Sequence, residues 1–231
     1  LYMKFLSFLR SFTKFEICLW LGSVLLVGAS FVLSSEDPVS LAASLVGVTA
    51  LILIAKGNVI GQILTVLFSI LYGVVSFYSR YYGEMITYLG MSAPIALAAV
   101  FTWLKNPAAS GEVRVNTLRG RDYALLFALG AAVTFGFYFI LKAFGTARLA
   151  ISTLSVLTSF LAASLTLKRS EYYALAYAAN DGVLIALWVA ASLSDPGNLP
   201  MVACFLAFLA NDIYGFINWL KMKKRQAGER R

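Results

Sequence analysis

The sequence contains no histidine, and only 13% of its 231 residues are charged. Without histidine, the chain cannot form an imidazole metal site, a Ser-His or Cys-His nucleophile pair, or a histidine proton relay. Its two cysteines lie inside apolar runs, so neither a disulfide nor a redox site is expected. A glycine-rich phosphate-binding loop is also missing. These absences argue against an enzyme, a resident cofactor, a bound metal ion and direct ATP-driven pumping.

Apolar residues are abundant, at 60% of the chain, and the mean hydropathy is +0.80. Eight runs are long enough to cross the hydrocarbon core of a membrane as helices, and none alternates as an outer-membrane strand would. The runs cover residues 15–33, 38–55, 59–79, 84–104, 123–144, 149–167, 172–193 and 200–220. We therefore predict an all-α integral membrane protein with eight transmembrane helices in contact with membrane lipid.

Basic residues are distributed unevenly between the two sides of the predicted membrane. When the N-terminus is placed in the cytoplasm, 16 of the 19 Lys and Arg residues fall on the cytoplasmic side, and only Arg80, Lys142 and Arg148 fall outside. This asymmetry follows the positive-inside rule, so both termini are predicted to be cytoplasmic. The basic C-terminal tail is attributed to topology and anionic lipid, and nucleic acid is not an expected partner.

Two of the runs end in similar sequences. Phe101-Thr102-Trp103-Leu104-Lys105 closes the fourth run, and Ile217-Asn218-Trp219-Leu220-Lys221 closes the eighth. Counting back from each gives two three-helix bundles, which are parallel because one linker helix joins them. An interfacial Trp next to a cytoplasmic Lys would explain both endings without a duplication. The expected division is an N-terminal segment with an additional first helix, a first bundle, a linker with its helix, a second bundle and a basic tail, at residues 1–37, 38–105, 106–145, 146–221 and 222–231.

Polar residues repeat deep within the seventh and eighth runs, as Asn180-Asp181 and Asn211-Asp212. Both pairs lie about 12–14 Å from the cytoplasmic end at 1.5 Å per residue, on neighbouring antiparallel helices. We count Asp181 and Asp212 as the only ionisable residues deep in the membrane. Since charge in a membrane is costly, such groups face a cavity or a partner. The four side chains therefore indicate either a binding site or hydrogen bonds between the two helices.

Two of the predicted helices also carry a stripe of polar and aromatic side chains along one face. Helical spacing aligns Gln62, Thr65, Ser69, Tyr72 and Ser76 on the third helix, and Tyr173, Tyr177, Asn180, Asp181, Leu184 and Trp188 on the seventh. We expect these stripes to face each other across the bundle. Rings beside carboxylates and amides suit a flat, polar, cationic ligand, because rings attract positive charge and amides bind polar edges.

The segment Ile213-Tyr214-Gly215-Phe216-Ile217-Asn218-Trp219 is similar to an I-Y-G-[WF]-x-x-W helix end, and Asn180 matches the asparagine of a Trp-x-x-Trp-x-x-x-Asn helix. Through these motifs residues 38–221 resemble the PnuC family of nicotinamide riboside transporters, relatives of the SWEET sugar transporters. The first helix lies outside the resemblance. Tyr173 and Ala176 stand at the two Trp positions of the family, which leaves Tyr177 and Trp188 as the residues expected to supply stacking.

The resemblance implies a SWEET-like 3+1+3 fold and a transporter in a bacterial-type inner membrane. It further implies uptake of nicotinamide riboside, a vitamin B3 form and NAD precursor, by facilitated diffusion with alternating access around a central site. A transporter of another nucleoside or sugar, and a membrane receptor or assembly protein, are the alternatives. Self-association into a homo-oligomer is also open. The candidate substrate-binding residues are Gln62, Thr65, Ser69, Tyr177, Asn180, Asp181, Trp188, Asn211, Asp212 and Asn218.

Overall fold

The computed structural model describes residues 12–34 and 38–229, and expectations for the remaining residues lie outside this range. Eight helical segments of the described residues are long and apolar enough to cross a membrane, which confirms the predicted number. The elements are α2 (Lys14–Ser34), α3 (Pro38–Ala55), α4 (Val59–Tyr78), α5 (Tyr82–Thr87), the π-helical turn η1 (Tyr88–Ser92), α6 (Ala93–Leu104), α7 (Gly120–Ala143), α8 (Leu149–Leu167), α9 (Tyr173–Ser192), the 3₁₀ turn η2 (Pro196–Asn198) and α10 (Leu199–Gly228).

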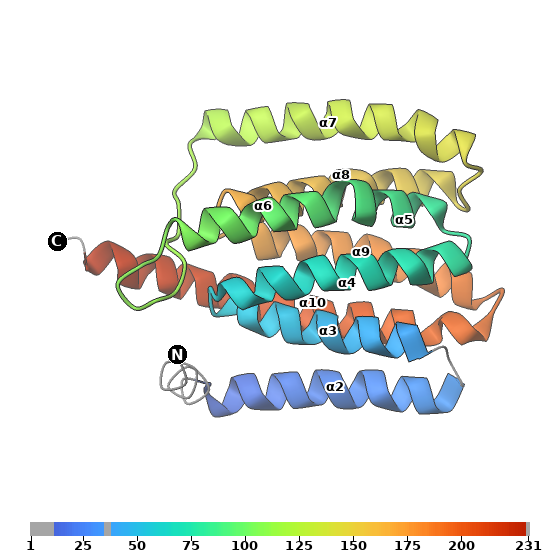
Figure 1. Ribbon diagram of the computed structural model, residues 1–231, viewed down its shortest axis with the longest axis horizontal. Coiled ribbons are helices and arrows are strands. Elements are labelled where there is room, and N and C mark those ends of the chain that lie inside the picture. The colour runs from blue at the N-terminus through green and yellow to red at the C-terminus, as the bar shows by residue number, and fades with distance from the viewer. Residues whose placement is uncertain (1–11, 35–37, 230–231) are drawn as a thin grey trace.

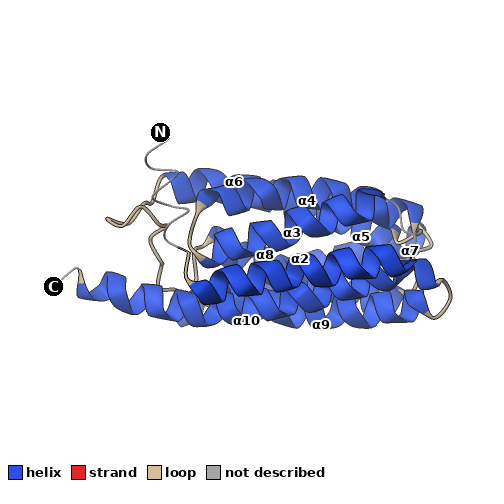
Figure 2. Cartoon of the chain, turned by 90° about the horizontal axis from the view of Figure 1, so that it is seen from below, coloured by secondary structure: helices blue, strands red, loops and turns tan. Residues whose placement is uncertain are grey.

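Two of these segments differ from the predicted runs. The fourth begins at Tyr82 and contains the π-helical turn immediately before Pro94, a residue that has no backbone N–H to donate within a regular helix. The eighth, α10, continues to Gly228, so most of the predicted basic tail is helical. Figure 2 shows helices along the whole body, loops at its two ends, and α10 projecting beyond the others.

The helices run side by side, with α7 at one edge and α2 at the opposite edge (Figure 1). Six of them form a closed ring, in which the neighbouring pairs are α3·α4, α4·α6, α6·α8, α8·α9, α9·α10 and α10·α3. Outside this ring, α2 packs against α3 and α10, and α7 packs against α8. The helices α4 and α9 therefore occupy opposite sides of the ring, and the side chains that they direct inward meet in its interior.

The ring has the contact pattern that a twofold repeat produces. Exchanging α3 with α8, α4 with α9 and α6 with α10 gives the same set of neighbours. The ends of α3 and α8 also match: a residue with positive φ, Gly57 at 67° and Arg169 at 58°, donates its amide to Ile54 and Thr166 at 2.8 and 2.9 Å. We call this end of the bundle the basic end, because the two turns carry Lys56, Lys168 and Arg169. The domain boundaries themselves stay predictions.

The two tryptophans of the repeated helix ends join the two halves of the ring. Trp103 Nε1 donates to the Thr166 carbonyl at 3.1 Å, and Trp219 Nε1 donates to the Ile54 carbonyl at 2.9 Å. Each acceptor is the penultimate residue of its helix, and the two rings lie 5.5 Å apart. Trp103 is 2% exposed and Trp219 is fully buried, so neither ring faces lipid as a residue of an aromatic belt would.

Residues 106–119, which we call the linker strap, cross the basic end between α6 and α7. Val113 N donates to the Gly57 carbonyl and Asn116 N donates to the Arg169 carbonyl, each at 2.9 Å. The Gln226 amide on α10 accepts from Val115 N at 2.9 Å and donates to the Val113 carbonyl at 3.0 Å. The strap is therefore bound to equivalent positions in both halves of the ring and to the end of α10.

Candidate functional site

Asn180 lies on the inner face of α9, midway along the helix, and is 1% exposed. Its Oδ1 accepts hydrogen bonds from Thr158 Oγ1 at 2.7 Å and from Ser159 Oγ at 2.9 Å, both on α8. Because the hydroxyls of Thr158 and Ser159 use the amide oxygen, the NH₂ group is the part of Asn180 that faces the ring interior. There it contacts the Tyr88 hydroxyl. Asn180 can therefore offer a fixed hydrogen-bond donor to a ligand.

The carboxyl groups of Asp181 on α9 and Asp212 on α10 contact each other. Both residues are 2% exposed, and the Oδ2 atom of each is buried without a hydrogen-bond partner. Two adjacent buried carboxylates repel each other, which favours a shared proton, so the pair carries at most one negative charge in the middle of the bundle. Such a pair can accept hydrogen bonds from hydroxyl groups or balance the charge of a cation.

Tyr177 lies one helical turn from Asp181, toward the basic end, and interacts with both carboxyl groups and with Thr166. It is half-buried. The next aromatic ring on the same face, Tyr173, lies 6.3 Å away and packs at 4.6 Å against Trp219. Tyr177 is thus the aromatic side chain of α9 nearest to the carboxyl pair, on the side of the tryptophan contact.

The predicted stripe on α4 is directed inward. Gln62 is 1% exposed and its Nε2 is buried without a partner. Thr65 Oγ1 donates to the Gly61 carbonyl at 2.9 Å, and Ser69 Oγ donates to the Thr65 carbonyl at 2.8 Å. The two hydroxyls therefore retain acceptor capacity only, whereas Gln62 retains a free donor.

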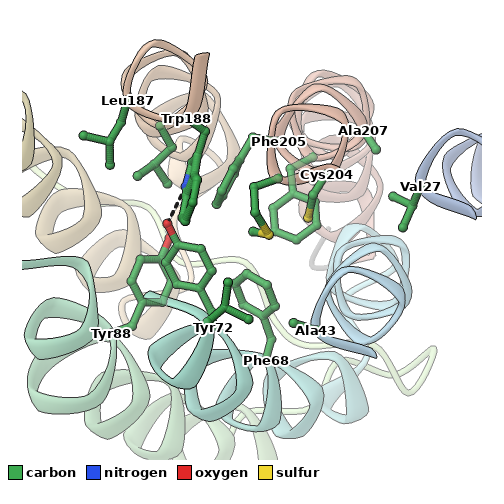
Figure 3. Packing of buried hydrophobic residues seen from close by; sticks show 14 of the residues in the cluster. Val27, Ala43, Phe68, Tyr72, Tyr88, Leu187, Trp188, Cys204, Phe205 and Ala207 are labelled. Atoms are coloured by element: carbon green, nitrogen blue, oxygen red, sulfur yellow. Dashed lines mark hydrogen bonds between the residues drawn. The ribbon is translucent and has the colours of Figure 1, made fainter. Parts of the chain in front are cut away.

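The stripes of α4 and α9 meet directly at Tyr72 and Trp188. Trp188 Nε1 donates to the Tyr72 hydroxyl at 2.8 Å, and both residues are fully buried. Figure 3 shows their rings gathered with those of Phe68, Tyr88 and Phe205. Trp188 has one N–H and uses it here, and at about 1.5 Å per residue it lies about 10 Å from Asp181, away from the basic end. It belongs to an aromatic cluster, made of Phe68, Tyr72, Tyr81, Tyr88, Trp188, Phe205 and Phe208, that closes the ring on that side.

The structure does not bring Asn211 or Asn218 to this group. Asn211 Nδ2 donates to Ser23 Oγ on α2 at 2.9 Å and to the Ala207 carbonyl at 2.8 Å, so its amide faces outward from the ring. Asn218 Nδ2 donates to the carbonyl of Ala55, the last residue of α3, at 2.8 Å. Asn218 also lines a cavity of about 1180 Å³ at the basic end, outside the ring. Both asparagines hold helices together in the structure.

The segment Ile213–Trp219 has clear packing roles. Tyr214 donates its hydroxyl to Glu16 Oε1 on α2 at 2.7 Å, and Trp219 reaches α3. A side chain at Gly215 would meet the Tyr173 hydroxyl at 3.1 Å, so glycine allows α9 and α10 to approach closely. This motif positions α10, and with it Asp212, against the neighbouring helices.

The sequence reading missed Glu84, which lies on α5 near the end opposite the basic end. It is fully buried, and its Oε1 accepts a hydrogen bond from Ser155 Oγ at 2.5 Å. Glu16 on α2 is also buried, where it forms an ion pair with Lys56 at 2.9 Å. Both acids lie in the first turn of their helices, so Glu84 and Glu16 are buried near helix ends, whereas Asp181 and Asp212 lie farther along theirs. Glu84 is the first residue of the predicted run 84–104 and lies one turn after Arg80, so its position resembles that of an interfacial charge.

The end opposite the basic end is closed by a second set of contacts. Arg148, at the start of α8, donates to the Ala190 carbonyl on α9 at 2.8 Å and to the Tyr81 hydroxyl. Burial raises the pKa of the Tyr81 phenol, and the neighbouring guanidinium acts in the opposite direction. Asn180 and the carboxyl pair thus lie between this closure and the tryptophan contact at the basic end.

Comparisons with known proteins agree with this architecture. The model of a family described as nicotinamide mononucleotide transporter matches residues 37–221, which leaves α2 outside that match. The relatives below align over 94–95% of the chain and therefore include α2, so the prediction that the first helix lies outside the resemblance is wrong. The nicotinamide riboside transporter PnuC of Neisseria mucosa is 28% identical over 225 residues, covering 94% of this chain and 85% of that protein. PnuC of Haemophilus influenzae is 23% identical over 223 residues, covering 95% of both chains.

A solved structure has the same fold. The crystal structure of the vitamin B3 transporter PnuC superimposes with a TM-score of 0.82 at 24% sequence identity, over 94% of both chains. The family and these relatives are transporters, so the expectation that the chain is not an enzyme agrees with them. Since the family model covers all six helices of the ring, α7 and the residues between them, the chain belongs to the nicotinamide mononucleotide transporter family.

Proposed function

We propose that this protein carries nicotinamide riboside across a bacterial-type inner membrane by facilitated diffusion. Two relatives that align over most of the chain are named as transporters of this compound. The family description names the mononucleotide instead, which is the riboside with a phosphate group added. The two substrates differ strongly in charge, so the charges inside the protein bear on the choice.

The observation that carries the proposal is the sign of the buried charges. Among the described residues, the buried charged side chains are all acidic: Glu16, Glu84, Glu171, Asp181 and Asp212. A phosphate group needs Lys, Arg or several N–H donors to leave water. No Lys or Arg of the described residues is buried as a whole, and Arg169, whose Nε and Nη1 are buried, lies in the turn after α8 at the basic end. A pyridinium ring needs the opposite surroundings, carboxylates and aromatic faces. The interior therefore favours the riboside.

In the proposed binding mode, the groups of the riboside match those around Asn180. The NH₂ group of Asn180 donates to the carboxamide oxygen or a ribose hydroxyl, and Gln62 offers a second donor. Asp181 and Asp212 accept from ribose hydroxyls and balance the pyridinium charge. Tyr177 supplies an aromatic face on the basic side, while Thr65 and Ser69 act as acceptors from α4. Asn211 and Asn218 do not contact the ligand in this binding mode. Trp188 belongs to the aromatic cluster that closes the ring on the side away from the basic end.

Alternating access fits the way the two halves meet. They contact each other through α3·α10 and α6·α8, and closures exist at both ends of the ring. Rocking of the halves would open the closure at one end at a time around the same central group. The positive-inside rule orients the basic end and both termini toward the cytoplasm. Exposed apolar side chains on α7, such as Phe135 and Phe139, fit lipid or a second copy of the chain.

Calorimetric titration of the purified protein tests the substrate. The ligands are nicotinamide riboside, nicotinamide mononucleotide, nicotinamide and glucose. We expect the riboside to bind most tightly and the mononucleotide more weakly, because its phosphate would meet carboxyl groups. Preferential binding of the mononucleotide would contradict the charge argument. Binding of glucose at least as tight as that of the riboside would favour the sugar-transporter alternative.

A further inference from the structure

Glu84 is a buried carboxyl group to which the proposed binding mode gives no role. It is fully buried on α5, and the Ser155 hydroxyl of α8 satisfies only its Oε1. Its Oε2 is buried and has no hydrogen-bond partner. Within residues 12–34 and 38–229, no ion pair to Glu84 occurs. A negatively charged group inside a membrane protein with an unused oxygen and no basic partner is strongly disfavoured unless it binds a proton or a cationic ligand.

Aromatic rings adjoin this carboxyl group. The hydroxyl groups of Tyr72, Tyr81 and Tyr88 lie in the neighbourhood of Glu84. The rings of Tyr72 and Tyr88 lie 4.4 Å apart, and those of Tyr81 and Trp188 lie 5.2 Å apart. Figure 3 shows Tyr72, Tyr88 and Trp188 directed toward one another from α4, η1 and α9. Aromatic faces beside a carboxylate are the combination with which proteins bind organic cations.

We propose that Glu84 and the aromatic cluster form a second, outer binding site, which holds a cationic aromatic substrate between the extracellular end and the Asn180 group. The proposal rests on the proposed function, because it concerns the route of a pyridinium compound. A permanent cation that enters the ring from this end passes the aromatic cluster first, where Glu84 is the buried counter-charge. Opening the Trp188–Tyr72 contact would expose the rings to it. Glu84 therefore makes transport selective for positive charge.

The test compares nicotinamide riboside with its dihydropyridine form. Addition of hydride neutralises the ring and leaves the ribose and the carboxamide in place. The measured quantity is the ratio of uptake rates of the two forms into proteoliposomes. Glu84→Gln preserves the shape of the side chain and its acceptor for Ser155 but removes the charge. We expect this substitution to lower the ratio of charged to neutral uptake at least about tenfold, because a charge-assisted contact is lost.

Two control variants separate charge from structure. Glu84→Asp keeps the charge and should keep the preference for the cation. Glu16→Gln removes a buried carboxyl group outside the ring, so both substrate forms should be affected alike. An unchanged ratio in Glu84→Gln, whether both rates fall together or neither falls, would overturn the outer site. Failure of the parent protein to carry the riboside at all would instead overturn the proposed function.

Discussion

Replacing Trp219 by phenylalanine removes one hydrogen bond and part of a ring from the contact between the two halves of the ring. The Ile54 carbonyl also accepts from the Gly57 amide at 2.8 Å, so the substitution leaves no buried carbonyl without a donor. The lost bond is then worth about 0.5–1.5 kcal/mol net. The smaller ring adds a cavity cost of about 1 kcal/mol at roughly 24 cal/mol per Å³. We expect the free energy of unfolding to fall by about 2 kcal/mol.

The repeat in the ring leads to the same prediction for the second tryptophan. Trp103→Phe should cost about the same, roughly 2 kcal/mol, because the Thr166 carbonyl likewise keeps a turn amide, that of Arg169, at 2.9 Å. The double variant should lose less than the sum, since the two rings are 5.5 Å apart and share one cavity. Equilibrium unfolding in mixed detergent micelles, titrated with a denaturing detergent, measures all three changes.

Trp20→Phe is the matched control for both substitutions. Trp20 Nε1 donates to Thr49 Oγ1 at 3.1 Å on the outer helix α2, and the ring is only half-buried. The same chemical change should therefore cost less there. If Trp103→Phe and Trp219→Phe destabilise the protein no more than Trp20→Phe, the inference that the pair stabilises the contact between the two halves is refuted. Fully additive effects would refute the coupling between the two rings.

Asn180→Ala should weaken riboside binding by about 1–3 kcal/mol, because a buried ligand group loses its partner; normal binding with a lowered unfolding temperature would favour a purely structural asparagine. Gln226→Ala removes both hydrogen bonds to the backbone of the linker strap, so limited proteolysis within residues 106–119 should become faster; an unchanged rate would show that the strap is held otherwise. A cysteine replacing Asn198 should react with an impermeant thiol reagent in intact right-side-out vesicles, and one replacing Ser110 only after permeabilisation. The reverse labelling would invert the topology.

The membrane helices could be predicted because crossing the hydrocarbon core requires a continuous apolar run of about 20 residues. Where they end is less well encoded. The apolar pattern of the eighth run stops near Leu220, but residues 221–228 are good helix formers, and α10 continues to Gly228 while Gln226 binds the linker strap. The ring itself depends on which faces pair, so the exchange symmetry of its contacts became visible only in the structure.

The candidate site was predicted in part for similar reasons. Helix periodicity alone places Asn180 and Asp181 on the same polar face of their helix. That this face points into the protein follows because polar side chains avoid lipid. Spacing does not determine partners, and Asn211 turns to Ser23 because α2 packs beside α10. Glu84 was missed because charge at the edge of an apolar run is normally interfacial. Here α5 begins earlier and α8 covers the carboxyl group, which places it inside the ring.

The central claim is that this protein moves nicotinamide riboside down its gradient through the ring of six helices. Proteoliposomes preloaded with unlabelled riboside, without any ion gradient, test it most directly. We predict exchange of labelled riboside, lost in Asn180→Ala, and a final level that an imposed proton or sodium gradient does not raise. Accumulation above equilibrium that follows such a gradient, and that disappears in Asp181→Asn or Asp212→Asn, would show coupled transport and contradict facilitated diffusion. Absence of exchange would contradict the function itself.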